Sequence, residues 1–523
     1  MASRTFAECF DLVYLTLSYL KTDYRTLSDC AVPTAQILSA KAPRYAPHVQ
    51  TLYVGGLLPD KAPNFPRQLA ECLATFTNLQ HLILAPLTEP GDAFADAIRI
   101  LPRLGCLKRL VVGWWCHSII SLAVPEASVA SVEYVPHSQP QTPALETLLE
   151  EDEEEDGGEG AGTPKRNRAN SPPDTTAEQY PNADEPPMFS SLEALTIYSP
   201  PRMILDALPT FLLGLSRIRE LHLLDNCGSI TPGVLTQLID QLEGATAFSI
   251  GLSYSLTDAT IFNTLATLHN LTEVQLTYYL QLNSPRRFPK LPNLRVFSVL
   301  HPRLATGDES RRFAAWVRRA IAGTSKLEAL HLVCIDDEPD DILRALISHL
   351  IAKHAKTLRV LDAGTATYVS KRMIRQLCSW CTGLEELHLC TGKASLAMLS
   401  TELHRMPHLH TARFLIKNAR YLPLPYNGLN AKIEDPEWLR GRWMRMCRTA
   451  RPLEGQYSLP ELILLHARHG RLRWLSIGDI MWESAWRVGE GGAVGLYTAM
   501  PRHLTRATRQ APVWVQRDGT HSD

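Results

Sequence analysis

One six-residue pattern recurs along most of this chain and limits its possible folds more than any other feature. It consists of a leucine or isoleucine, two variable residues, an apolar residue, a variable residue and a final apolar residue, as in Leu79-Gln-His-Leu-Ile-Leu84. The alternation that ends each copy predicts a short strand with one buried face. Clear copies occupy residues 79–84, 107–112, 192–197, 218–223, 271–276, 294–299, 327–332, 358–363 and 384–389, and weaker copies begin at Val49, Ala245, Leu409 and Leu472.

The segments between the copies change to a helical period, as in residues 340–350 and 370–378. From residue 192 to 409 the copies follow one another at roughly 23–33 residues, the range of leucine-rich repeats with helical units. One strand and one helix cannot bury their apolar faces alone, so the units must stack. The predicted fold class is therefore α/β: a leucine-rich-repeat solenoid with a parallel inner sheet and outer helices.

The strand register also predicts which side chains point away from the core. Any single one of these side chains is equally well explained as an ordinary polar residue in contact with solvent. As a group they form the inner surface of a solenoid, which is a natural recognition surface. His81, Arg109, Thr196 and Trp474 share this register. The predicted partner-binding residues are Tyr198, Glu220, His222, Glu273, Gln275, His331, Asp362, Glu386, His388 and Arg413.

Two segments interrupt the repeats. The first, residues 137–187, holds the acidic run 150–156, then glycine-rich and proline-rich stretches. Its apolar content is too low to offset the entropy of ordering, so we expect a disordered loop, and a tolerated surface insertion is the plain reading of its role. The second lies between Leu409 and Leu472, where residues 437–448 mix arginines with tryptophans. We expect a capping helix there rather than a nucleic-acid contact.

The chain end predicts two strands, at residues 486–488 and 493–497, around the glycine-rich turn 489–492. They would cover the edge of the last repeat. The expected organisation is a helical segment at 1–40, first repeats at 41–136, the insertion at 137–187, the main solenoid at 188–480, and a strand-rich cap and tail at 481–523.

Composition limits the class of partner. Lysine and arginine total 53 against 54 acids, a net charge of −1, which disfavours a general nucleic-acid binder. No apolar run is long enough to span a membrane. Eleven cysteines scattered without a secretory leader favour free thiols in a reducing compartment, cytoplasmic or nuclear.

The sequence contains no convincing motif for catalysis, cofactor binding or metal binding. Gly489-x-Gly491 lacks the third glycine of a dinucleotide fingerprint, and no phosphate-binding loop, zinc-protease or nucleophile-elbow motif occurs. Cys378, Cys381, His388 and Cys390 have metal-like content, but the end of a helix and the following strand already explain them. We therefore expect no enzyme activity, no metal and no cofactor.

The N-terminal segment differs from the repeats. Residues 10–20 form an apolar helical stretch that ends at Lys21-Thr-Asp23, and Thr26-Leu-Ser-Asp-Cys-Ala31 follows. These motifs resemble a degenerate F-box of fungal F-box proteins, which continue into a ribonuclease-inhibitor-like leucine-rich-repeat solenoid. Here the opening Leu-Pro is absent, and Ala31 runs directly into Val32-Pro33, which shortens the motif. The resemblance implies docking to the adaptor subunit of an SCF-type cullin–RING ubiquitin ligase through Phe10, Leu17, Leu20, Leu27 and Cys30.

The resemblance thus implies a substrate receptor: a monomer within a complex that holds the adaptor and an unknown protein substrate, the substrate on the concave face. An alternative is an interaction scaffold of the same fold without ligase coupling, in which the N-terminal segment only caps the solenoid. A further alternative is an accessory protein of a small GTPase. An enzyme is the least supported class.

Overall fold

The computed structural model describes residues 46–56, 65–86, 94–116, 119–120, 189–279, 284–302, 304, 306–334, 344–364, 368–416, 471–477, 480–488 and 494–503. The chain divides into two units, Pro125–Pro187 and the remainder, and every described residue belongs to the remainder. The F-box-like segment, the 137–187 insertion and residues 437–448 lie outside the described residues. Their predicted structures stay predictions.

A single sheet runs through the described unit, and its strands follow one another in sequence order. Strands β1 to β13 pair in parallel, whereas β13, β14 and β15 pair antiparallel. Every copy of the sequence pattern contributes one strand, as predicted. The strands are β1 Thr51–Gly56, β2 His81–Pro86, β3 Arg109–Val112, β4 Ala194–Tyr198, β5 Glu220–Asn226, β6 Ala247–Leu252, β7 Glu273–Thr277, β8 Val296–His301, β9 Ala329–Cys334, β10 Val360–Asp362, β11 Glu386–Thr391, β12 Thr411–Ile416, β13 Trp474–Ile477, β14 Ile480–Val488 and β15 Val494–His503.

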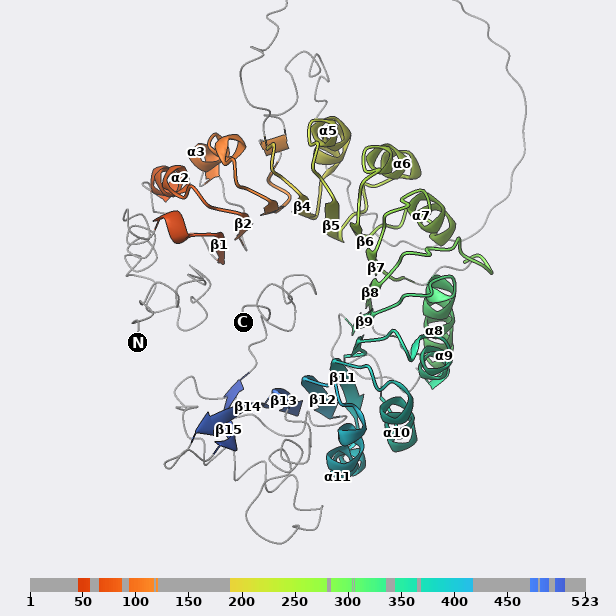
Figure 1. Ribbon diagram of the computed structural model, residues 1–523. Coiled ribbons are helices and arrows are strands. Elements are labelled where there is room, and N and C mark those ends of the chain that lie inside the picture. Colours follow the sequence, from red (N-terminus) through yellow and green to blue (C-terminus); the bar gives the residue numbers. More distant parts are fainter. Residues whose placement is uncertain are drawn as a thin grey trace, which may run out of the picture. The chain divides into compact units, whose positions relative to one another are not determined.

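Helices connect many of the parallel strands, and Figure 1 shows them along one side of the sheet. Threonine caps define several helix starts: the side chains of Thr231, Thr257 and Thr306 accept backbone N–H groups of the first turn. The helical segments are η3 Ala46–His48, α2 Phe65–Thr75, α3 Ala95–Ile98, η5 Leu101–Arg103, α5 Arg202–Leu213, α6 Pro232–Asp240, α7 Asp258–Leu265, α8 Gly307–Ile321, α9 Arg344–His354, α10 Lys371–Trp380, α11 Lys393–Glu402 and η7 Leu403–Arg405.

The core lies between the sheet and the helices and is continuous. The second residue of each strand from β1 to β13 is apolar and in register with its neighbours, as with Leu195, Leu221 and Phe248. All belong to one buried cluster that extends from Ala46 to Leu475. A fully buried leucine or phenylalanine contributes about 1.5–3 kcal/mol, and no unit could obtain that burial without its neighbours. The fold is therefore an α/β solenoid of the leucine-rich-repeat kind.

Element boundaries differ modestly from the sequence prediction. The expected helix at 370–378 corresponds to α10, and the helix expected at 340–350 is described only from Arg344, as α9. The two terminal strands pair as expected but extend further, because β14 and β15 pair along most of their length, from Ile480 with His503 to Val488 with Val494.

The eight cysteines within the described residues form no disulfide, as predicted, and six of them are buried. Cys106 is an exception because it is exposed, in the turn before β3. None of the described helices has both the length and the apolarity needed to cross a bilayer.

Substitution of one buried leucine by alanine tests the continuous core. Leu330 is fully buried in β9, whereas Leu213 at the end of α5 is 75% exposed. We expect Leu330→Ala to reduce the free energy of unfolding by about 2–5 kcal/mol, through lost burial and the cavity left behind. Leu213→Ala should change it by less than about 0.5 kcal/mol. Urea denaturation followed by circular dichroism measures both, and equal effects would contradict this account of the core.

Candidate binding face

The side of the sheet opposite the helices presents a polar row. Successive residues of a strand point to opposite faces, so the residue after each core leucine points away from the core. Backbone pairing aligns these third-position residues from β4 to β13. We call them the middle row: Thr196, His222, Ser249, Gln275, Ser298, His331, Asp362, His388, Arg413 and Ser476.

A second row lies two residues earlier on the same face. It consists of the first residue of each strand and includes His81, Arg109, Glu220, Glu273, Glu386 and Trp474. We call this the first row, and the two rows together the strand face. Every predicted partner-binding residue except Tyr198 lies in one of these rows, and Tyr198 extends the same alternation at the end of β4. The sequence register therefore predicted the composition of this face correctly.

Exposure along the strand face differs from the prediction. The middle row was expected to face solvent, but His222, Gln275 and His331 are only 2–6% exposed. Neighbouring strands lie about 4.8 Å apart, so side chains at equal register cover one another. Glu220, Glu273, Asp362, Glu386, His388 and Arg413 keep partial exposure, as do Arg109, Tyr198 and Trp474.

Arg109, Glu220 and His222 form the first of two charged clusters. Nη2 of Arg109 in β3 donates a hydrogen bond to Oε2 of Glu220 in β5 over 2.9 Å. The pair bridges β4, where the first-row residue is the small Ala194. Nε2 of His222 lies 3.6 Å from Oε2 of Glu220, and its Nδ1 is hydrogen-bonded to Oγ of Ser249 at 2.6 Å.

Charge balance in this cluster favours an ionised Glu220. Burial acts to raise the pKa of Glu220, but the neighbouring His222 and the positive charge of Arg109 outweigh it, and the pKa is lowered. The cluster is thus a fixed ion pair at the N-terminal part of the strand face.

The second cluster places one carboxylate between two histidines. Oδ2 of Asp362 in β10 lies 3.2 Å from Nδ1 of His388 in β11 and 3.9 Å from Nδ1 of His331 in β9. Burial acts to raise the pKa of Asp362, but the two histidines outweigh it and hold this pKa below its usual range.

The turn after β10 holds the Asp362 side chain in place. The backbone N–H of Gly364 donates to Oδ1 of Asp362 over 2.9 Å. Gly364 has φ of +44°, a left-handed conformation that glycine adopts without steric cost. A carboxylate anchored at both oxygens in this way fixes the position of the partly exposed His388.

Several features of this face were not predicted from single copies of the repeat. Ser249, Ser298 and Ser476 complete the middle row, and register alone could have identified them. A small apolar patch of Val111 and Leu224, with Ile83 and Tyr198 packed against it, also lies outside the main core.

Two further sets of residues from the sequence analysis are the adaptor-binding residues and the cysteines considered as metal ligands. The adaptor-binding residues Phe10, Leu17, Leu20, Leu27 and Cys30 lie outside the described residues. Cys378 and Cys381 are buried free thiols at the end of α10, and burial raises their pKa values to about 12 and about 11. Thiols held in the neutral form are poor metal ligands. Within the described ranges, no group of three histidine, cysteine or acidic side chains is arranged to hold a metal ion.

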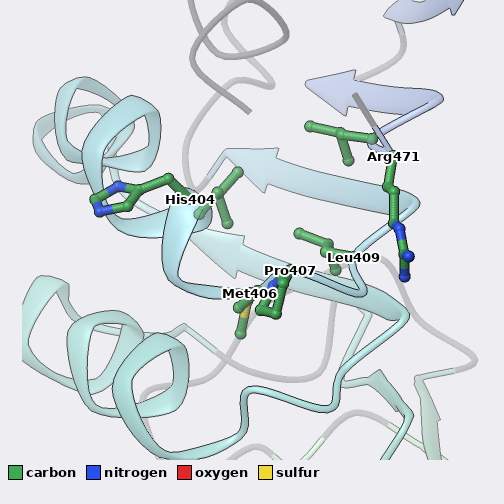
Figure 2. A pocket seen from close by; sticks show the side chains of 7 residues that line it. His404, Met406, Pro407, Leu409 and Arg471 are labelled. Atoms are coloured by element: carbon green, nitrogen blue, oxygen red, sulfur yellow. The ribbon is translucent and has the colours of Figure 1, made fainter. Parts of the chain in front are cut away.

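A small pocket lies away from the strand face, at the turns that lead into β12 and β13 (Figure 2). Its lining is mainly apolar and contains no carboxylate or thiol, so it offers no chemistry to the strand face. The lining residues are Leu403, His404, Met406, Pro407, Leu409, Arg471 and Leu472.

Comparison with known proteins gives remote structural matches. No family model and no curated protein matches this chain. A chain from the crystal structure of the Rad7 and Elc1 complex in yeast is 16% identical, over 44% of this chain and 51% of that chain, with a TM-score of 0.25. The match thus spans about half the length of the yeast chain. Similarity this low transfers neither function nor partners.

Removal of the Asp362 charge tests the second cluster. We expect Asp362→Asn to lower the free energy of unfolding at pH 6 by about 1–3 kcal/mol, because it removes the charged partner of both histidines. Asp206→Asn on exposed α5 is the matched control and should cost less than about 0.5 kcal/mol.

The pH dependence of this difference has a definite sign. The folded pKa of Asp362 lies below the unfolded value of about 3.9, so its contribution is complete above about pH 4 and is lost as pH falls further. The difference in free energy of unfolding between the wild type and Asp362→Asn, measured by urea denaturation, should therefore be smaller at pH 3 than at pH 6. A constant difference would contradict the assignment.

Proposed function

We propose that this chain is a non-enzymatic binding protein that recognises another protein on the strand face. The observation that carries the proposal is the in-register alignment of polar and charged side chains over many consecutive strands. An extended surface of this kind suits a macromolecule better than a small ligand, which prefers an enclosed apolar pocket.

The charges of the strand face favour a partner with its own polar groups. Glu273 and Glu386 are partly exposed first-row carboxylates on β7 and β11, and Asp362 and His388 lie in the middle row beside Glu386. The hydrogen-bonded strands already hold the backbone of these residues in place. Binding therefore costs little conformational entropy, which favours affinity. Glu220 and Arg109 already neutralise each other, so we assign them a supporting role.

Coupling to a ubiquitin ligase is the finer part of the proposal. It rests on the resemblance of residues 1–40 to a degenerate F-box, with Phe10, Leu17, Leu20, Leu27 and Cys30 toward the adaptor. In this arrangement the chain acts by proximity: it holds a target near a ligase-bound ubiquitin conjugate and raises the effective concentration of the two. No catalytic group is required from this chain.

Charge reversal on the strand face tests protein recognition. We expect Glu273→Lys with Glu386→Lys to remove specific proteins from the set that co-purifies with the tagged chain, because like charges then face the partner. The control reverses two exposed acids on the helix side, Asp206→Lys with Asp240→Lys. Quantitative mass spectrometry of both purifications gives the result. Identical sets for both variants would refute the strand face as the binding surface.

Adaptor binding is tested separately. We expect the full chain to retain the purified adaptor subunit of an SCF-type ligase in a pull-down, and Leu17→Asp with Leu20→Asp to abolish retention by placing charges in an apolar contact. Leu213→Asp on the exposed surface of α5 is the matched control. Equal retention by both variants, or none by the unmodified chain, would exclude ligase coupling and leave a binding scaffold.

A further inference from the structure

A second surface of the same unit carries an excess of positive charge. It lies in the segments 284–295, 318–328 and 353–359, which lead into β8, β9 and β10, and the last two segments include the ends of α8 and α9. The only carboxylate in these three segments is Glu328. Apart from Arg295 and Arg359, which pair with acids, we call the exposed basic residues of these segments the basic edge: Arg286, Arg287, Lys290, Arg318, Lys326, Lys353 and Lys356.

Backbone hydrogen bonds place the three segments side by side. The N–H of Glu328 donates to the carbonyl of Arg295 over 2.7 Å, and the N–H of Arg359 donates to the carbonyl of Glu328 over 2.7 Å. The side chain of Lys290 packs against Gly323, where an added Cβ would lie 2.8 Å from Cγ of the lysine. Three successive units therefore present one continuous edge.

The start of the basic edge is held firmly. Nη2 of Arg319 donates to Oγ of Ser284 over 3.1 Å, and its guanidinium lies 5.2 Å from the centre of the Phe288 ring. Phe288 in turn stacks on Phe262 with ring centres 4.2 Å apart. Arg286 and Arg287 thus extend from an anchored segment, which reduces the entropy lost when they bind a ligand.

Acidic side chains of the described unit do not neutralise the basic edge. Glu328 pairs with Arg295 at 3.6 Å, and Arg359 pairs with Glu385, so these two arginines are already matched. No ion pair joins a carboxylate within the described ranges to any of the seven residues of the basic edge. The pKa of nearby His349 is lowered, first by burial and then by the charges of Arg318 and Lys353, which agrees with a positive local potential.

The spacing and surroundings favour carboxylates on a polypeptide. Adjacent helices pack about 8–10 Å apart, and an extended chain rises about 3.3 Å per residue, so acids about three residues apart reach successive units. The same edge already binds carboxylates in the Arg295–Glu328 and Arg359–Glu385 pairs. Within these three segments the only aromatic side chain, Phe288, is packed between neighbours rather than exposed to stack on a base.

We propose that the basic edge binds an acidic, extended segment of a partner protein, in which aspartate or glutamate recurs about every three residues. This surface is separate from the strand face, because it is formed by helix ends and by the turns before the strands, and not by the strand side chains. It gives the chain a second contact, which adds to the binding of one partner or admits a second partner.

The test measures fluorescence anisotropy of a fluorescein-labelled Glu-Ser-Ser repeat peptide with the full chain. A Gln-Ser-Ser peptide and an oligothymidine of equal net charge serve as the other probes. We expect the full chain to bind the glutamate peptide, more weakly as salt rises, and to bind both other probes less tightly.

Matched charge reversals locate the binding surface. Arg287→Glu with Lys326→Glu should weaken binding of the glutamate peptide by about fivefold or more, since each reversal replaces an attraction by a repulsion. Lys371→Glu with Arg372→Glu, at the exposed start of α10, makes the same change in net charge and should weaken binding by less than about twofold. All four side chains are exposed, and thermal melting verifies that both variants fold.

Three results would overturn the proposal: no binding of the glutamate peptide by the unmodified chain, equal weakening by both variants, or tighter binding of the oligothymidine. The last result would assign the basic edge to nucleic acid instead. None of these results bears on the strand face, because its residues are unchanged in both variants.

Discussion

The in-register ladder of buried apolar residues is the interaction on which the rest of this structure depends. Leu195, Leu221, Phe248 and their successors occupy the same position in neighbouring strands and pack against the helices behind them. A shift of one residue in any strand would turn its apolar residues to the opposite face. Burial therefore fixes the register, and the register decides which side chains share a face.

The polar surface is a consequence of that register. With the second and fourth residues of each strand in the core, the first and third must lie on the other side. Arg109 and Glu220 meet in this way although 111 residues separate them in sequence, and Asp362 comes to lie between His331 and His388 from three different units. The same stacking that aligns these groups also covers most of the middle row. The groups that keep partial exposure include the first-row carboxylates and the middle-row residues Asp362, His388 and Arg413.

The sequence was sufficient for the architecture and for the composition of the strand face, because strand period and core position repeat in every unit. It was not sufficient for the details of the site. The shielding of His222 and His331 depends on the size of neighbouring side chains, which a single strand does not reveal. The Arg109–Glu220 pair requires a small residue at Ala194 in the strand between, and the position of Asp362 depends on the left-handed turn at Gly364. The basic edge was also missed, because its residues are dispersed over three segments and converge only when the units stack.

The direct pairing of β3 with β4 has a consequence for the integrity of the chain. Val112 ends one strand and Ala194 begins its immediate parallel neighbour, so the long intervening sequence leaves the sheet at the end of β3 and re-enters it at the start of the adjacent strand. The sheet does not depend on that sequence for its continuity, since the backbone ladder, the shared core and the Arg109–Glu220 pair already join the two sides. Proteolytic cleavage between these strands should consequently leave two fragments that remain associated non-covalently.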